Sequence, residues 1–547
     1  MSPRVPQRLS RILRPPLPVA IGLGVFLFAI LFALYTRHAW EDWYITFRPA
    51  KNLATGHGLV YNEGERVHTF TSVIGTLLPA LLSFLSFNVS DDLTLWLFRI
   101  VCAATLGIAA TLLAGTARRG HAGAATAVLL AVCAATDAKT VDFSINGMET
   151  PFTLLALALF LYFTSTLSKQ KLAVRLGVVW AVLQYARPDG FVYSLLLMAS
   201  MLLFQEERRS TLRMLALSCG VGALLYMPWF LFATSYYGSV VPHSLIAKHA
   251  WMDGNGATFY VGRAVSFLGS FVLLRPGVFD YVFSPPYAPI FSLLPAGLIV
   301  SRVLGVAACL VWIFPRVGFA GRAASFACMG YLFYLDVFTP LIYPWYVPGT
   351  TWLALTALAF ALDALRRHPE AFSVPEGGLR VASVALVAGF LAFGLTLTAI
   401  TAHQFRFAQD AIEDGQRRRI GEWIRAHAAS PHETVFLECA GYIGFYSGLK
   451  LYDYPGMTAP EVVAARRELH TEKFLPLVQR LRPDWLVLRP EPEELNGMWN
   501  SDSAFLKQHY VVLKTFDASS AIDQESFKPF EALFRHDARF VVARKIP

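Results

Sequence analysis

VAIGLGVFLFAILFALYT (residues 19–36) is the stretch that decides the fold, because it is a long apolar run without a charged residue. A helix of about 20 such residues crosses the hydrocarbon core of a bilayer, which is about 30 Å thick. Similar runs recur along most of the 547-residue chain, in which charged residues make up only 16%. Because soluble proteins average about 25% charged residues, the sequence predicts a polytopic α-helical membrane protein.

Basic residues predict how these runs are oriented. We expect about eleven transmembrane helices, since each run is close to the length that a bilayer requires. The runs lie near residues 19–37, 94–116, 122–136, 150–166, 172–186, 191–204, 212–233, 286–314, 323–339, 347–365 and 381–401. Arg4, Arg8, Arg11 and Arg14 precede the first run, and alternate connections after it are short and basic. The positive-inside rule then places the N-terminus in the cytoplasm and the C-terminal region outside.

Polar stretches are concentrated on the predicted outer side. They are residues 41–72, 137–150, 186–190, 235–254 and 339–349. The apolar segment 73–87 would reverse the orientation of every later loop if it crossed the membrane. We therefore predict a helix along the outer surface there, within a first external loop of residues 41–93. This asymmetry indicates an active site that faces outward.

After residue 401 the composition becomes that of a soluble domain. Residues 408–429 (AQDAIEDGQRRRIGEWIRAHAA) read as an amphipathic helix, and TVFLEC, DWLVLRP, HYVVLKTF and ARFVVARK read as strands. The predicted organisation is a membrane module of residues 1–401 followed by an external α/β domain of residues 402–547.

Nucleotide and metal chemistry leave no recognisable pattern in the chain. Walker, dinucleotide-binding and zinc-ligand spacings are absent, and the six cysteines show no paired spacing. The net charge of +9 is explained by the basic inner loops rather than by nucleic acid binding. We expect no cofactor, no essential metal ion and no nucleic acid partner.

Glu41 and Asp42 are the candidate catalytic residues. They open the polar segment EDWYITFRPAKNLATGHGLVYNEGERVHTFTS (residues 41–72), immediately after the first predicted span. An acidic pair at this position is often only an interfacial anchor. The loop after it is too structured for a simple exit, however, because ITFRPAKNLATGHG is typical of an amphipathic helix and GLVYNEGERV of a strand with a turn. A partly desolvated carboxylate there can act as a general base on a hydroxyl group.

Other candidate residues have structural alternatives of their own. Arg187 and Asp189 in ARPDG form either a binding pair or a local ion pair at a helix stop. His243 and Lys248 in VVPHSLIAKHA lie on a predicted helix that begins near Ser244, which either binds a phosphate or rests on the membrane. The aromatic cluster in YPWYVP is either an interfacial belt or a platform for a sugar ring. It consists of Tyr343, Trp345 and Tyr346.

Six stretches, in order, resemble one family. They are EDWYITFRPAKNLATGHGLVYNEGERV, INGMETPFTLL, YARPDG, VPHSLIAK, YPWYVP and AGYIGFYSGLKLYDYPGMTAP. This set resembles GT-C membrane glycosyltransferases, and most closely the mycobacterial terminal β-1,2-arabinofuranosyltransferase type and its bacterial relatives. The resemblance extends from about residue 40 to about residue 465.

The resemblance implies an inverting glycosyltransferase in the bacterial cytoplasmic (inner) membrane. Such an enzyme moves a sugar from a polyprenyl-phosphate donor to an envelope glycan, glycolipid or protein acceptor. Glu41 or Asp42 would deprotonate the acceptor, while Arg187, His243 and Lys248 would bind the donor phosphate. The residues expected to bind substrate are Tyr44, Arg48, Asn52, His57, Glu149, Asp189, Tyr343, Trp345 and Tyr346.

Two positions depart from the family pattern. Glu41 stands where the family usually has an aspartate that is assigned as the base, and Asp42 occupies the second acidic position. His68 replaces an acid at the end of the loop. Either carboxylate could therefore be the base, and arabinose specificity does not follow.

Rival functions remain open at the level of sequence. A lipid A aminoarabinose or protein O-mannosyl transferase shares this architecture, and an O-antigen ligase or polymerase also acts outside on prenyl-linked sugars. A transporter is less consistent with the pattern, because transporters place ionisable residues within their spans. Here the predicted spans carry few charges.

Overall fold

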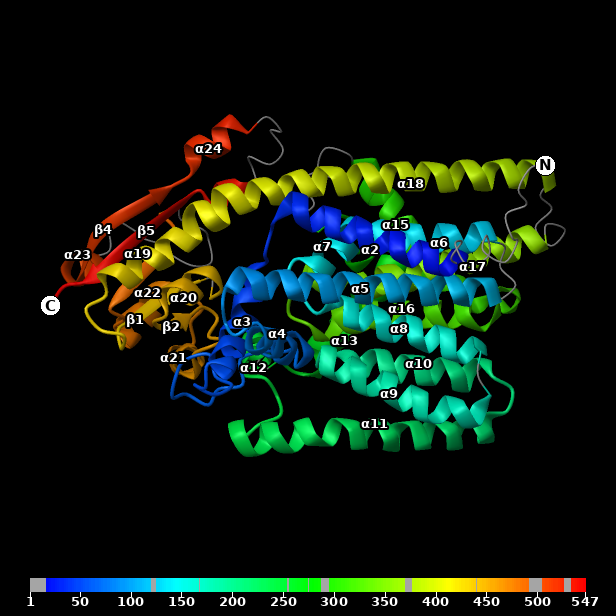
Figure 1. Ribbon diagram of the computed structural model, residues 1–547, viewed down its shortest axis with the longest axis horizontal. Coiled ribbons are helices and arrows are strands. Elements are labelled where there is room, and N and C mark those ends of the chain that lie inside the picture. The colour runs from blue at the N-terminus through cyan, green and yellow to red at the C-terminus, as the bar shows by residue number, and fades with distance from the viewer. Residues whose placement is uncertain are drawn as a thin grey trace, which may run out of the picture.

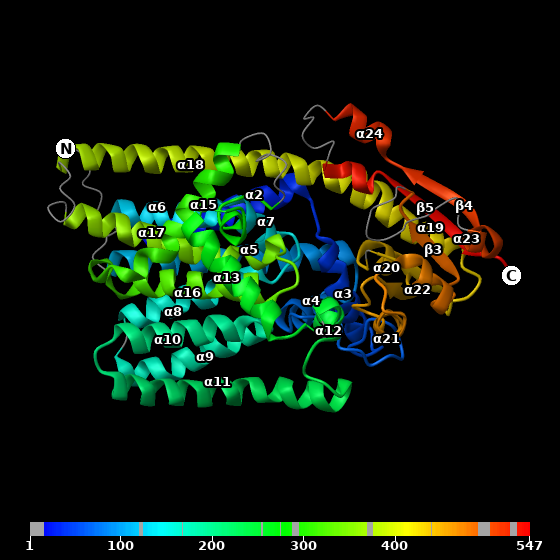
Figure 2. The same ribbon diagram turned by 180° about the vertical axis from the view of Figure 1, so that it is seen from behind.

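The computed structural model describes residues 16–119, 124–166, 168–252, 255–273, 275–286, 295–368, 376–438, 440–490, 504–525 and 533–547. Figures 1 and 2 show long helices running side by side, with a small sheet at one end of the molecule. The basic residues that precede the first apolar run lie outside the described residues.

Each predicted apolar run lies at least in part on a helix of this bundle. The helices are α2 (Leu17–Thr36), α5 (Asp91–Arg119), α6 (Ala124–Thr136), α8 (Thr150–Thr166), α9 (Lys169–Ala186), α10 (Gly190–Phe204), α11 (Arg208–Tyr237), α15 (Pro295–Leu310), α16 (Gly318–Phe338), α17 (Pro348–Arg367) and α18 (Glu376–Phe407). In the described part, five helices are long and apolar enough to cross a membrane, or up to seven if each bent pair is one span. The protein is therefore a multi-pass membrane protein, and the predicted count of about eleven spans is not confirmed.

One apolar helix of the bundle was not predicted. Helix α13 (Ala257–Leu273) packs against α16, and it carries Arg263 in its middle. The Arg263 guanidinium donates to the carbonyl oxygens of Asp336 and Thr339, at 2.6 and 3.0 Å. The charged Arg263 interrupts the apolar run in the sequence, and in the structure these two carbonyl groups at the end of α16 accept its hydrogen bonds.

Small residues allow the helices of the bundle to approach closely. A Cβ atom added to Gly22 of α2 would lie 2.6 Å from the carbonyl oxygen of Gly107 on α5, and one added to Gly107 would lie 2.7 Å from that of Gly22. Such backbone contacts are typical of helix packing in membranes, where van der Waals contact stabilises association.

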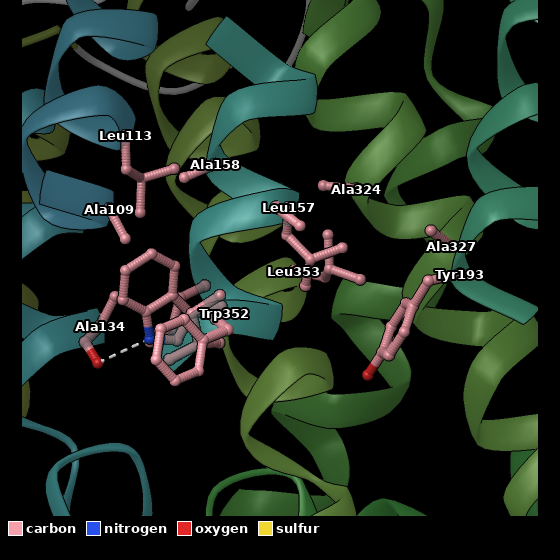
Figure 3. Close-up of a cluster of buried hydrophobic side chains, with 14 of the residues drawn as sticks. Ala109, Leu113, Ala134, Leu157, Ala158, Tyr193, Ala324, Ala327, Trp352 and Leu353 are labelled. Carbon is pink, nitrogen blue, oxygen red and sulfur yellow. Dashed lines mark hydrogen bonds between the residues drawn. The ribbon is translucent and has the colours of Figure 1, made fainter. Parts of the chain in front are cut away.

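Large side chains fill the centre of the bundle. Figure 3 shows Trp352 and Leu353 of α17 beside Leu113 of α5 and Leu157 of α8. Trp352 is 2% exposed, and its Nε1 donates to the carbonyl oxygen of Ala134 on α6 at 3.0 Å. The bond satisfies the only polar atom of a fully buried indole.

Short elements lie at the two ends of the bundle. They are α3 (Glu41–Ala54), α4 (Ile74–Leu85), α7 (Ala138–Ile145), α12 (His243–His249), η1 (Ala250–Met252), η2 (Val278–Tyr281), η3 (Val311–Ile313), η4 (Pro315–Val317) and η5 (Pro344–Tyr346). Elements η3 and η4 lie between α15 and α16 at the end far from the sheet, and the others lie nearer the sheet. The predicted helices at residues 45–58, 73–87 and near Ser244 are confirmed as α3, α4 and α12. Figure 1 shows α3, α4 and α12 together at the end nearer the sheet.

The predicted strand in GLVYNEGERV (residues 58–67) is wrong, because this segment is irregular. Its carbonyl groups are satisfied by side chains instead of a partner strand. Asn52 Nδ2 donates to the carbonyl oxygens of Val60 and Tyr61 at 2.8 and 3.3 Å, and the Tyr237 hydroxyl donates to that of Leu59 at 2.6 Å. Buried backbone groups need partners, and here they find them without a sheet.

The described C-terminal residues contain a five-stranded sheet in the order β2-β1-β3-β5-β4. The strands are β1 (Thr434–Leu437), β2 (Lys450–Asp453), β3 (Trp485–Leu488), β4 (Tyr510–Asp517) and β5 (Arg539–Lys545). Strand β1 is parallel to β2 and β3, whereas β5 is antiparallel to β3 and β4. All four predicted strands are present, and β2 is an addition.

Helices cover both faces of the sheet. They are α19 (Arg419–His427), α20 (Tyr442–Ser447), α21 (Pro460–Leu469), α22 (Phe474–Leu481) and α23 (Ala504–His509), whereas α24 (Ser519–Gln524), close to the short turn η8 (Arg535–Asp537), packs against η7 (Ala408–Arg418). Val435 and Val487 face a cluster with Ile424 of α19, whereas Phe436 and Leu486 face the opposite cluster. The alternation follows from the two-residue period of a strand.

A continuous helix joins the bundle to this domain. Helix α18 runs directly into a π-helical segment, η7 (Ala408–Arg418), and then into α19. The predicted boundary at residue 401 falls inside this helix, as the yellow ribbon in Figure 1 shows. The division into domains stays a prediction.

Candidate active site

The residues that precede α3 are fixed by hydrogen bonds. The Trp40 N–H donates to the carbonyl oxygen of Asn146 at 3.0 Å, and its Nε1 donates to Asp142 Oδ2 at 3.1 Å. The Ala39 N–H donates to Gln409 Oε1 at 3.0 Å. The start of α3 is therefore attached to α7 on one side and to η7 on the other.

Glu41 is engaged by the C-terminal domain. Its Oε1 accepts hydrogen bonds from the N–H groups of Gly441 and Tyr442 at 2.8 and 3.1 Å. Its Oε2 lies 3.2 Å from Arg417 Nη1. Burial raises the pKa of the Glu41 carboxyl, while Arg417 and the Gly441 N–H oppose this effect. Both carboxylate oxygens thus have partners within the protein.

Asp42 has a different environment, although it is the next residue. No described residue donates a hydrogen bond to its carboxylate, whose electrostatic neighbours are the cations Lys248 and Arg187. Burial raises the pKa of the Asp42 carboxyl above its usual range, and the two cations lower it to a smaller extent. A half-buried carboxylate with a raised pKa and oxygens that accept no hydrogen bond from the described residues is suited to accept a proton.

Lys248, near the end of α12, is the first of these electrostatic neighbours of Asp42. Its Nζ is 5.3 Å from the ring centroid of Tyr343, and no acid among the described residues forms an ion pair with it. Burial lowers the pKa of the Lys248 ammonium, but Tyr346, Asp42 and Tyr343 outweigh burial and the pKa is raised overall. The ammonium therefore stays charged and is available to an anionic ligand.

Arg187 is neutralised by acids, in contrast to Lys248. Its Nε and Nη2 donate to Asp189 Oδ1 and Oδ2 at 2.9 and 3.1 Å, and its Nη1 donates to Glu149 Oε1 at 3.1 Å. The Tyr331 hydroxyl also donates to Asp189. Two carboxylates around one guanidinium leave no positive charge over, so this cluster orients groups more than it attracts anions.

Aromatic rings form a wall beside these charges. The rings of Tyr343 and Trp345 in η5 stack at 4.5 Å, and the guanidinium carbon of Arg187 lies 4.8 Å from the ring centroid of Tyr346. The ring centroids of Trp345 and Trp40 are 6.5 Å apart, so this aromatic wall extends to the residue that precedes α3. Aromatic faces of this kind bind the apolar face of a sugar ring.

Four further residues expected to bind substrate make contacts within the protein, and their role in binding stays a prediction. Arg48 donates to the carbonyl oxygens of Gly444 and Leu449 at 2.8 and 3.0 Å, and the Tyr44 hydroxyl is 3.2 Å from that of Tyr446. These two residues link α3 to α20. Asn52 organises the loop after α3, and His57 is exposed beside Glu63.

His243 also lies away from Asp42. Burial lowers the pKa of its imidazole, and its electrostatic neighbours Asp453 and Glu461 belong to the C-terminal domain. His68, which replaces a family acid, is buried with its ring stacked on Tyr237 at 4.8 Å. Neither residue is an electrostatic neighbour of Asp42, and the role of His243 as a phosphate ligand stays a prediction.

Two contributors to this region were missed from the sequence. Tyr331 lies within an apolar helix, and its hydroxyl group is the only feature in the sequence that could have indicated a polar contact there. Arg417 lies in a charged amphipathic stretch where nothing distinguishes it from Arg418 and Arg419. Only the fold shows that one of these three arginines reaches Glu41.

Metal binding was not expected, and the structure adds no candidate site. No group of three His, Cys, Asp or Glu side chains that could hold a metal ion occurs within the described residues. Five cysteines are free, and Cys439 lies outside the described residues. The expectation that no cofactor or metal is needed stays a prediction.

Parts of the chain are similar to known proteins. A family model described as a domain of unknown function (DUF8728) matches residues 403–539. The terminal β-(1→2)-arabinofuranosyltransferase of Corynebacterium glutamicum is 27% identical over 332 residues, which are 55% of this chain and 46% of that protein. Its namesake from Mycobacterium tuberculosis is 28% identical over 262 residues, 43% of this chain and 40% of that protein. The predicted resemblance is confirmed.

The chain spans less than half the length of these terminal β-(1→2)-arabinofuranosyltransferases. Among solved structures, the crystal structure of ArnT from Cupriavidus metallidurans bound to undecaprenyl phosphate has a TM-score of 0.48 and 15% identity. The alignment covers 96% of this chain and 97% of that one.

The stretches that resemble the arabinofuranosyltransferases meet in space. Residues 41–67 contact residues 440–460 through Glu41 and Gly441. Glu149 binds Arg187, Arg187 lies over Tyr346, and Lys248 lies over Tyr343. Four of the residues that these segments contribute are electrostatic neighbours of one carboxylate, Asp42: Lys248, Arg187, Glu149 and Tyr343.

Proposed function

We propose that the protein is an inverting glycosyltransferase that uses a polyprenyl-phosphate sugar. It would transfer the sugar to an acceptor hydroxyl of an envelope glycan, glycolipid or protein at the outer face of the bacterial cytoplasmic membrane. The observation that carries this proposal is the pairing of Asp42, which has free carboxylate oxygens, with Lys248, which has no acidic partner among the described residues. The similarity to arabinofuranosyltransferases supports the reaction class.

The proposed chemistry is a single displacement. The Asp42 carboxylate accepts the proton of the acceptor hydroxyl, and the acceptor oxygen forms a bond to the anomeric carbon. The bond between that carbon and the phosphate oxygen breaks, and the lipid phosphate leaves with the electron pair. Lys248 stabilises the charge that develops on the phosphate, where a fixed cation in a water-poor site is most effective.

Asp42 is the proposed base in preference to Glu41. A general base must present an oxygen to the substrate within hydrogen-bond reach. Both oxygens of Glu41 are occupied by Gly441, Tyr442 and Arg417, and freeing one would leave buried donors unsatisfied. In the family the first acidic position is usually assigned as the base, so this chain would use the second.

Arg187, Glu149 and Asp189 have an orienting role in this proposal. Their charges cancel, and the cluster lies directly against the aromatic wall through Tyr346. We propose that the cluster and the ring faces of Tyr343 and Trp345 position the sugar between Asp42 and Lys248.

The test uses the purified full chain in detergent with farnesyl-phosphate-linked arabinofuranose, mannose and glucose. Donor binding and slow donor hydrolysis are followed for the wild type and for Asp42→Asn, Lys248→Met and Glu41→Gln. We expect one donor to saturate, Asp42→Asn to lower turnover by about 10²- to 10⁴-fold and Lys248→Met to lower it by about 10²- to 10³-fold.

Asp410→Asn is the matched control, because this aspartate is exposed and pairs only with Arg406 on its own helix among the described residues. Its turnover should equal that of the wild type. Failure of a well-folded wild type to bind any of the donors would contradict the transferase proposal. Full turnover by Asp42→Asn would refute its assignment as the base.

A further inference from the structure

The C-terminal domain contacts both halves of the candidate site, each through a residue adjacent to a proposed functional one. Glu41 precedes Asp42, and Ala247 precedes Lys248. The domain binds the side chain of the first and the backbone of the second. Because both contacts are made by the same domain, the distance between the Asp42 carboxylate and the Lys248 ammonium depends on how that domain is placed.

The contact at Glu41 fixes the first turn of α3. Gly441 and Tyr442 donate two N–H groups to Oε1, and Arg417 binds Oε2. Arg417 is itself attached to the domain, since its Nη2 donates to Asp537 Oδ2 at 2.8 Å. Arg489 donates to Asp537 Oδ1 at 2.7 Å from the end of β3. Glu41 is thereby connected to the sheet.

The contact at Ala247 fixes the end of α12. Arg466 of α21 donates through Nη1 to the carbonyl oxygen of Ala247 at 3.0 Å, and to that of Pro455 at 2.8 Å. Its Nη2 binds Glu472 Oε2 at 2.7 Å, and its side chain is 3% exposed. A buried, triply engaged arginine holds one geometry, so the backbone beside Lys248 is set by α21.

We propose that Glu41 and Arg466 are positioning residues through which the C-terminal domain sets the distance between Asp42 and Lys248. The domain is in this sense part of the active site, although none of its side chains is assigned to the reaction. This inference rests on the proposed function and adds the way in which its two reacting groups are held in place.

The two residues act on different steps. Glu41 positions the base, so its loss affects the proton transfer and lowers kcat. Arg466 positions the phosphate ligand, so its loss weakens donor binding and raises KM. A displacement of about 1 Å at a reacting group can cost about 10²-fold in rate. General damage to the fold would lower the amount of active enzyme in both variants. It would not lower kcat in one variant and raise KM in the other.

The experiment compares Glu41→Gln and Arg466→Met with matched controls, Glu422→Gln and Arg480→Met. Each control removes the charge of an exposed residue in an ion pair of the same region. Kinetics use the donor that saturates the wild type, and binding uses farnesyl phosphate without a sugar. Hydrogen exchange of peptides from α3 and α12 is measured on the same full-length preparations.

We expect Glu41→Gln to lower kcat about 10-fold with KM unchanged, and Arg466→Met to raise KM and weaken farnesyl phosphate binding about 10-fold. Exchange should increase in α3 for the first variant and in α12 for the second. Kinetics and exchange equal to those of the controls would overturn the inference. So would a complete loss of turnover in Glu41→Gln, because that result would make Glu41 the base.

Failure of the proposed function gives a different pattern. If the wild type processes none of the donors, the transferase proposal falls, while exchange in α3 and α12 still tests whether the domain holds these helices. Unchanged exchange in both variants would then overturn the positioning inference on its own.

Discussion

Glu41 and Asp42 are adjacent acids whose surroundings differ because neighbouring residues of a helix point about 100° apart. One side chain points to the C-terminal domain and is saturated with donors, and the other points to α12 and keeps its oxygens free. The sequence alone could identify this pair but could not choose between its members. The partners of Glu41 come from positions about 400 residues away, as the 2.8 Å bond to Gly441 shows.

The pH dependence of turnover should reveal which acid is the base. The proposed base must be deprotonated, and the pKa of Asp42 is raised by burial. Turnover should therefore be complete at neutral pH and fall as the pH decreases through a midpoint above the usual aspartate range, which is near 4. Lys248 lowers the pKa of Asp42, so Lys248→Met should move this midpoint to higher pH. The measurement is kcat against pH for both proteins, and coincident midpoints would contradict the assigned neighbours.

Helices and loops differ in how much of their structure is encoded locally. Long apolar runs predicted the bundle helices, because bilayer thickness and backbone hydrogen bonding leave a segment of that length few alternatives. Residues 58–67 resemble a strand with a turn, but in the described part of the chain they pair with no strand, and the side chains of Asn52 and Tyr237 satisfy their carbonyls. Such partners are set by the fold, so the local sequence could not reveal them.

Close helix packing gives a prediction for a glycine in α2. In Gly22→Val, the new Cβ would meet Gly107 and Thr111 of α5, so the helices must separate. Overpacking of this kind costs about 1–3 kcal/mol, and the thermal midpoint in detergent should fall. The control is Gly24→Val, since nothing lies within 4 Å of an added Cβ there. Equal midpoints for the two variants would show that α2 and α5 are not packed in this way.

The molecule as a whole is joined by a buried ionic cluster around Arg417. Its guanidinium binds Glu41, Glu413 and Asp537, at 3.2, 2.7 and 2.8 Å. These acids come from α3, η7 and η8, so one side chain connects the membrane module with the sheet domain. Removal of one partner from a buried cluster leaves uncompensated charges in place.

Arg417→Met should therefore destabilise the junction strongly. We expect a loss of about 3–5 kcal/mol, as for other buried pairs that lose one partner. Hydrogen exchange in α3 and η8 should increase before exchange in the bundle core. Arg418→Met is the matched control, because the neighbouring side chain is 39% exposed and pairs on its own helix. A similar, small effect of both substitutions would show that the junction is held by apolar contacts alone.

The unbroken helix from α18 through η7 to α19 also fixes the rotational setting of the domain. Within the described residues it runs without a break from Glu376 to His427, so it begins in the bundle and ends at the sheet. A helix turns by about 100° per residue, so one alanine inserted between Ala402 and Phe407 would rotate the whole domain around this axis. Gly441 would then swing away from Glu41, and α21 from α12. The number of residues in this helix thus sets which face of the domain is turned toward the candidate site. A related chain with an insertion or deletion in this helix would keep the contact with α3 only if the domain rotated back by another route.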